Sequence, residues 1–129
     1  MDHMLVALSP AEVLDKITIL EIKSERMSES GQLKNVRTEL SLLRETWNRE
    51  IEMDQRLHSL RRQLKEVNEA LWQIEDEIRD KERAKQFDEG FIELARSVYV
   101  SNDRRSRIKK EVNLHLGSKL IEEKSYREY

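Results

Sequence analysis

Residues 57–78 read LHSLRRQLKEVNEALWQIEDEI, and the spacing of their aliphatic side chains decides the fold class. The aliphatic residues follow one another at alternating steps of three and four: Leu57, Leu60, Leu64, Val67, Leu71, Ile74 and Ile78. Such steps, kept over three heptads, place every one of these side chains on a single stripe of a helix. The stretch therefore predicts a long helix with a coiled-coil-like seam.

A second stripe lies upstream of the first. It consists of Leu33, Val36, Leu40, Leu43 and Trp47, again at steps of three and four. No glycine or proline separates the two stripes, so one helix of about 50 residues could run from 32 to 83. The phase of the pattern slips between Trp47 and Met53, and we therefore favour a turn near Asn48–Asp54 over an unbroken helix.

The start of a first helix is predicted at residues 9–12, which read Ser-Pro-Ala-Glu. The Ser9 hydroxyl can cap free N–H groups, the glutamate can complete a capping box, and the proline suits the first helical position. This helix should run to about Met27 and end at a loop over 28–31. A second helix should follow from about Gln32.

A further break is predicted at 85–90, before a last long helix. Its inner face should carry Phe91, Leu94, Val98, Ile108, Val112 and Leu116, with Gly117 as the C-terminal cap. We expect a tail over 118–129, with one short helix through Leu120 and Ile121, and an N-terminal extension over 1–8. The sequence thus predicts one all-α domain over 1–129, an elongated antiparallel helical bundle or hairpin.

The composition agrees with an all-α fold. The 129 residues include only three glycines and one proline, too few for the turns of an all-β or doubly wound protein. Charged residues make up 39% and hydrophobic residues 37%, so the chain can bury helix stripes but not a thick core.

Several classes of function are excluded or disfavoured. The 24 basic and 26 acidic residues leave no basic excess for a nucleic-acid backbone, and the basic run at 104–110 spreads around its helix. The chain has no cysteine, its three histidines are scattered, and it has no glycine-rich phosphate loop. We therefore expect no metal site, no cofactor and no catalytic signature. The longest apolar run, 4–8, is too short for a membrane span or a signal peptide, which favours the bacterial cytoplasm.

Polar side chains occupy positions that each helix otherwise gives to aliphatic ones. Asp15 and Glu21 do so in the first helix, and Asn102 and Arg105 do so in the last, where Lys109 borders the same stripe. On the 57–78 helix a largely polar stripe flanks the aliphatic seam, and it consists of Asn68, Trp72, Glu75 and Arg79.

These nine residues have two interpretations. In the first they form an internal salt-bridge and amide network that fixes helix register, because an unpaired buried charge is costly. In the second they line a cleft where Arg79, Arg105 and Lys109 converge on a carboxylate or phosphate. In either case we predict that Glu21 pairs with Arg105, directly or through Asn102, because arginine suits a fixed pair with a carboxylate.

The chain also resembles a known family over nearly its whole length. The resemblance is carried by residues 9–27 (SPAEVLDKITILEIKSERM), Asn35, Glu39-Leu40, residues 67–80 (VNEALWQIEDEIRD), residues 93–113 (ELARSVYVSNDRRSRIKKEVN) and residues 122–126 (EEKSY). These segments are similar to a family of small bacterial proteins known only as domain of unknown function 6165. Residues 43–61 are the least characteristic.

The resemblance implies motif positions but no established activity, substrate or cofactor. The motif positions that it implies are Asp15, Lys16, Glu21, Asn68, Trp72, Glu75, Asp76, Asn102, Asp103, Arg105 and Lys109. Several of them are the polar residues that the helical pattern places toward the interior.

Two functional hypotheses follow from the residues. The first is an interaction or assembly module that forms a homodimer, because so long a seam is better buried between two chains; a different protein partner is left open. The alternative is a small anionic-ligand-binding protein, or an enzyme, that uses the polar cleft between helices.

Overall fold

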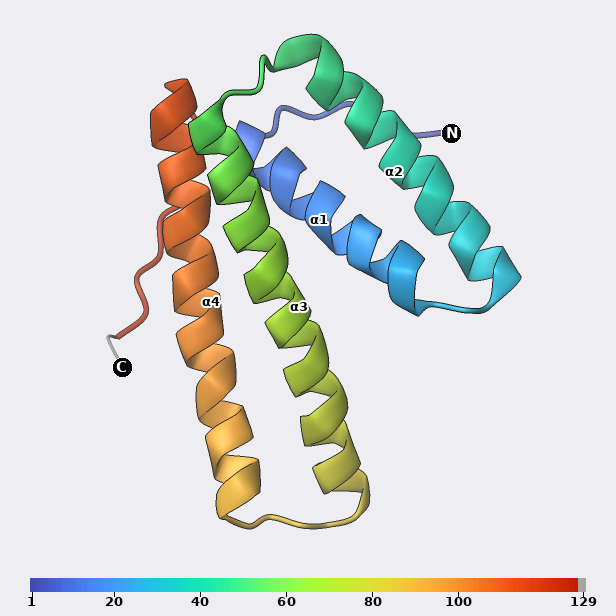
Figure 1. Cartoon of the computed structure of the whole chain (residues 1–129), viewed down its shortest axis with the longest axis vertical. Helices are drawn as coiled ribbons and strands as arrows, with labels where there is room; N and C mark the ends of the chain where they lie inside the picture. The colour runs from blue at the N-terminus through green and yellow to red at the C-terminus, as the bar shows by residue number, and fades with distance from the viewer. Residues whose placement is uncertain (128–129) are drawn as a thin grey trace.

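The chain folds into four helices, with no strand among the residues described, 1–127, in the computed structural model. The helices are α1 (Pro10–Arg26), α2 (Ser30–Glu50), α3 (Gln55–Arg83) and α4 (Glu89–Leu116). Figure 1 shows α3 and α4 side by side as a long antiparallel hairpin, with α1 and α2 as a second hairpin. The predicted all-α helical bundle is confirmed. Residues 128 and 129 of the predicted tail lie outside the described residues.

Helix α1 is the centre of the packing. It contacts α2, α3 and α4, whereas α2 packs on α1 alone among the described helices. Because α1 has neighbours on both sides, both of its apolar faces are buried, through Leu14 and Ile17 on one and Ile22 on the other. The buried hydrophobic cluster combines the face of Leu14 and Ile17 with the upper seam of α3, at Leu57, Leu60, Leu64 and Val67.

The turn favoured between the second and third helices is confirmed. Helix α2 ends at Glu50, and α3 begins at Gln55 after the N-cap residue Asp54. The Asp54 carboxylate accepts a hydrogen bond from the Leu57 N–H at 2.8 Å, and its second oxygen lies 2.7 Å from His115 Nε2 of α4. This one carboxylate therefore starts α3 and ties it to the end of α4.

Two details at the start of α1 and α2 differ from prediction. The break before α2 is shorter than 28–31, because the Glu29 carboxylate caps the helix by accepting from the N–H groups of Gly31 and Gln32 at 2.9 and 2.6 Å. At α1 the Ser9 hydroxyl caps as predicted. The capping-box role of Glu12 is wrong, because its carboxylate pairs with Lys109 of α4 instead.

The end of α4 is partly as predicted. Gly117 ends the helix in the left-handed conformation, with φ of 66°, where a side chain would be strained. The predicted short helix through Leu120 and Ile121 is wrong, since residues 118–127 are not helical. Figure 1 shows this tail returning alongside α4.

The seam between α3 and α4 is buried unevenly. At its upper end Leu57, Leu60 and Leu64 are completely buried, because α1 covers them. Toward the tip of the hairpin α1 no longer covers the pair (Figure 1). There the seam side chains are only half-buried, at Leu71, Ile74 and Ile78 of α3 and at Phe91, Leu94 and Val98 of α4.

Candidate functional site

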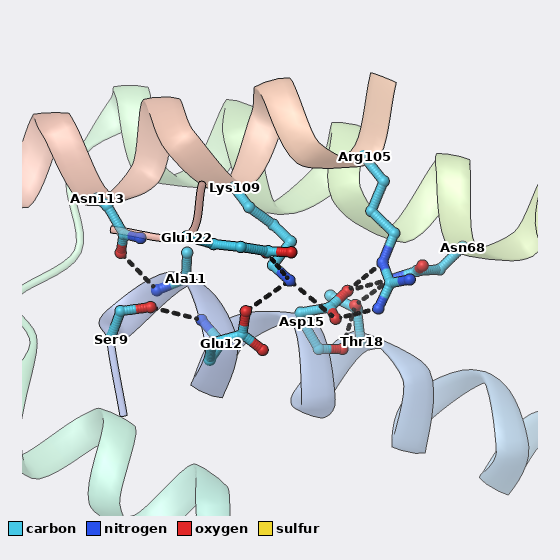
Figure 2. Close-up of polar contacts among 10 residues, drawn as sticks. All are labelled: Ser9, Ala11, Glu12, Asp15, Thr18, Asn68, Arg105, Lys109, Asn113 and Glu122. Carbon is cyan, nitrogen blue, oxygen red and sulfur yellow. Dashed lines mark hydrogen bonds and ion pairs between the residues drawn. The ribbon is translucent and has the colours of Figure 1, made fainter. Parts of the chain in front are cut away.

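A buried ionic cluster joins α1, α3 and α4 around Asp15 (Figure 2), whose side chain is only 4% exposed. Arg105 of α4 donates from Nε to Asp15 Oδ1 at 3.0 Å and from Nη2 to Oδ2. Asn68 of α3 donates from Nδ2 to Asp15 Oδ1 at 2.9 Å and to Thr18 Oγ1 at 3.0 Å. The carboxylate is thus held by a cation and an amide from two other helices.

Lys109, one turn after Arg105 on α4, extends this cluster. Its Nζ lies 2.7 Å from Glu12, 3.1 Å from Glu122 and 3.8 Å from Asp15. Burial acts to lower the pKa of Lys109, but the hydrogen bonds to Glu12 and Glu122 outweigh it and raise that pKa. The hydrogen bond from Lys109 lowers the pKa of Glu122. Because Lys109 also binds Glu12, it ties the C-terminal tail to both α1 and α4.

Asn113 is a site residue that sequence reasoning missed. Its Oδ1 accepts from the Ala11 N–H at 3.0 Å, so α4 caps the start of α1 (Figure 2). A signal was present, because Arg105, Lys109 and Asn113 follow one another at steps of four and share one face of α4. That face supplies every contact of α4 with the polar edge of α1 in Figure 2.

The predicted pair of Glu21 and Arg105 is wrong. Arg105 binds Asp15, while Glu21 Oε2 accepts from Arg44 Nη2 of α2 at 2.7 Å and from Arg61 Nη2 of α3 at 2.5 Å. The two carboxylates of α1 point to different faces, because a separation of six residues turns a helix through about 240°. The face that carries Asp15 meets α4.

The Glu21 carboxylate stays ionised although it is buried. Burial acts to raise its pKa, but the hydrogen bonds from Arg61 and Arg44 outweigh it, and the pKa is lowered. The second oxygen, Oε1, is buried and has no hydrogen-bond partner within residues 1–127. Glu21 therefore belongs to a separate cluster that joins α1 to α2 and α3.

A cleft of about 370 Å³ opens beside the Asp15 cluster, between the lower half of α1 and the two long helices. Its walls come from three helices: Ile19, Ile22, Lys23, Asn68, Leu71, Trp72, Glu75, Asp76, Arg79, Val98, Asn102 and Arg105. Six of the nine predicted site residues therefore line one cleft. The other three, Asp15, Glu21 and Lys109, do not line the cleft. Asp15 nevertheless binds Arg105, which does.

The charges of the cleft are only partly compensated. The hydrogen bonds from Arg105 to Asp15 raise the Arg105 pKa against burial, so the guanidinium stays charged. Arg79 lies 3.3 Å from Glu75 in an exposed pair. Lys23 and Asp76 have no ion pair within the described part of the chain. Lys23 was not predicted, although it follows Ile19 by one turn on the second apolar face of α1.

The fold and the cleft define an all-α protein whose long hairpin is tied to a central helix by buried ion pairs. The model of the family of unknown function DUF6165 matches residues 4–129, and the chain belongs to this family. No curated protein and no solved structure is significantly similar to the chain.

No helix within residues 1–127 has the length and hydrophobicity that a membrane crossing requires. No group of three histidine or acidic side chains in the same range is arranged to hold a metal ion.

Proposed function

We propose that the protein is a helical assembly module of the bacterial cytoplasm, and that it works as a homodimer joined through the lower halves of α3 and α4. The observation that carries this proposal is the half-buried seam from Leu71 to Val98. Exposed apolar side chains lie on the same part of the hairpin, at Phe87, Ile92, Tyr99 and Val100. Exposed apolar surface gathered on one part of a molecule is typical of an interface.

The charge distribution favours a second copy as the partner. Residues 75–93 at the tip contain eight acidic and four basic side chains. On α4, residues 96–110 contain six basic side chains and one acidic one, and Arg96, Arg104, Arg107 and Lys110 are exposed. An antiparallel pair of hairpins would place the acidic tip of each copy beside the basic stretch of the other. The absence of cysteine from the sequence is compatible with a reducing compartment.

We expect light scattering of the purified chain at micromolar concentration to give twice the mass of one chain. Ile74→Glu should make it monomeric, because a carboxylate would be buried in an apolar contact. Arg104→Glu with Arg107→Glu should weaken the dimer through like-charge repulsion, without touching the hairpin seam. The matched control is Leu42→Glu, at an exposed leucine of α2, which should remain dimeric.

Circular dichroism separates loss of association from loss of fold. A monomeric wild-type chain at about 100 µM, well above the micromolar range, would refute the dimer. Equal loss of association in Leu42→Glu would move the interface away from the hairpin.

The cleft favours a second candidate function, the binding of a small anionic ligand. The supporting observation is that cations from α1, α3 and α4, namely Lys23, Arg79 and Arg105, line one hollow of a size seen in ligand sites. In a thermal-shift panel of nucleotides and carboxylic acids, a ligand at 100 times its dissociation constant should add about 2.7 kcal/mol of stability. A panel in which no anion raises the melting temperature would contradict this function.

A further inference from the structure

The side chain of Arg105 is held by one edge and free along another. A guanidinium carries five N–H donors on a flat fork. Asp15 occupies the edge formed by Nε and Nη2, whereas Nη1 has no hydrogen-bond partner within residues 1–127. Because Asp15 is itself buried and bound by Asn68, the guanidinium is fixed in orientation at the wall of the cleft.

A second cation lines the same cleft. Lys23 of α1 lines the hollow and has no carboxylate partner in the described part of the chain. By contrast, the exposed Arg79 is already paired with Glu75. The cleft therefore offers one fixed guanidinium edge and one ammonium group without an ion pair in the described residues, a combination that fits a carboxylate.

One part of the cleft lining is apolar and includes an aromatic side chain. Trp72 is half-buried there, beside Leu71 and Val98, and Ile22 faces them from α1. The side chain of Asn102 lines the same hollow and makes no hydrogen bond within the described residues. A flat apolar group would cover the indole ring, and a polar substituent could bind the free amide.

From these contacts we infer that the cleft binds a small carboxylic acid with a flat apolar body, its carboxylate between Arg105 and Lys23 and its ring on Trp72. The inference rests on the second candidate function and names its ligand class. The volume of about 370 Å³ is near the lower end of the range for small-molecule sites, so the ligand is small. The dimer proposal does not depend on it.

The fluorescence of Trp72 can report this binding directly. The other tryptophan, Trp47, is a buried residue of α2, so Trp47→Phe leaves Trp72 as the sole indole emitter. Titration with phenylacetate should give a saturable change in emission. Phenylacetamide has the same shape without the charge. Its dissociation constant should be at least about tenfold higher, as expected for loss of a charge-assisted contact.

Two variants test the two ends of the ligand. Lys23→Met should weaken phenylacetate binding about tenfold and leave phenylacetamide binding unchanged, because only the ion pair is removed. Trp72→Leu should weaken the binding of both phenylacetate and phenylacetamide, as measured by calorimetry. Lys34→Met, at an exposed lysine of α2, is the matched control and should bind as the parent does.

The comparison ligands separate the two claims. If phosphate or succinate binds and phenylacetate does not, the cleft is an anion site but the inferred ligand class is wrong. If no anion binds, both the ligand class and the second candidate function are overturned. Equal binding of the acid and the amide would overturn the role of Arg105 and Lys23.

Discussion

Asp15→Ala should lower the free energy of unfolding by about 3 kcal/mol, since it removes the partner of a largely buried arginine. Arg105 is 28% exposed, so water would reach part of its guanidinium, and the loss should fall at the lower end of the range for broken buried pairs. Asn68 would also lose the acceptor of its amide. Urea unfolding followed by circular dichroism measures the change.

The matched control is Asp103→Ala, at an exposed aspartate of α4, which should change stability by less than about 0.5 kcal/mol. Asp15→Leu combined with Arg105→Met should recover much of the loss, because well-packed apolar side chains often replace a buried ion pair without cost. If Asp15→Ala loses less than about 1 kcal/mol, the cluster is not what ties α4 to α1.

Much of this cluster could be predicted from the sequence, because polar residues at apolar positions stand out. Asp15 and Arg105 are identified in that way and Asn68 through the stripe that flanks the α3 seam, and Asp15 binds both of the others. The predicted pairing of Glu21 with Arg105 was wrong because a helical wheel gives the direction of a side chain but not which neighbouring helix lies there. Asp15 and Glu21 both interrupt apolar faces, and only the placement of α2 and α4 on opposite sides of α1 distinguishes them.

The missed contacts are those made by distant backbone or by the tail. Nothing in the local sequence around Ala11 indicates that Asn113 will cap its N–H, since the two residues are 102 positions apart. Glu122 lies in the tail, which is not helical although a short helix was predicted there, so its contact with Lys109 depends on the path of the tail. The even periodicity of the α3 seam likewise gave no sign that its burial would change along the helix.

Two alanine substitutions test how burial changes along the α3 seam. Leu64→Ala, at a fully buried position beneath α1, should destabilise by about 3 kcal/mol through lost burial and the cavity that remains. Ile78→Ala removes a comparable aliphatic group from the same seam near the tip. Because Ile78 is half-buried in one chain, its loss should be only about 1 kcal/mol in a monomer.

The dependence of these losses on protein concentration links stability to assembly. A dimer interface contributes to stability only when the dimer is populated, so its contribution grows with concentration. If a second copy covers the tip, the cost of Ile78→Ala should rise between sub-micromolar and 100 µM protein, on the order of 1 kcal/mol for a newly buried aliphatic side chain. The cost of Leu64→Ala should stay constant, because α1 covers that position within one chain. If both costs are independent of concentration, the tip of the hairpin remains in solvent and the dimer interface lies elsewhere.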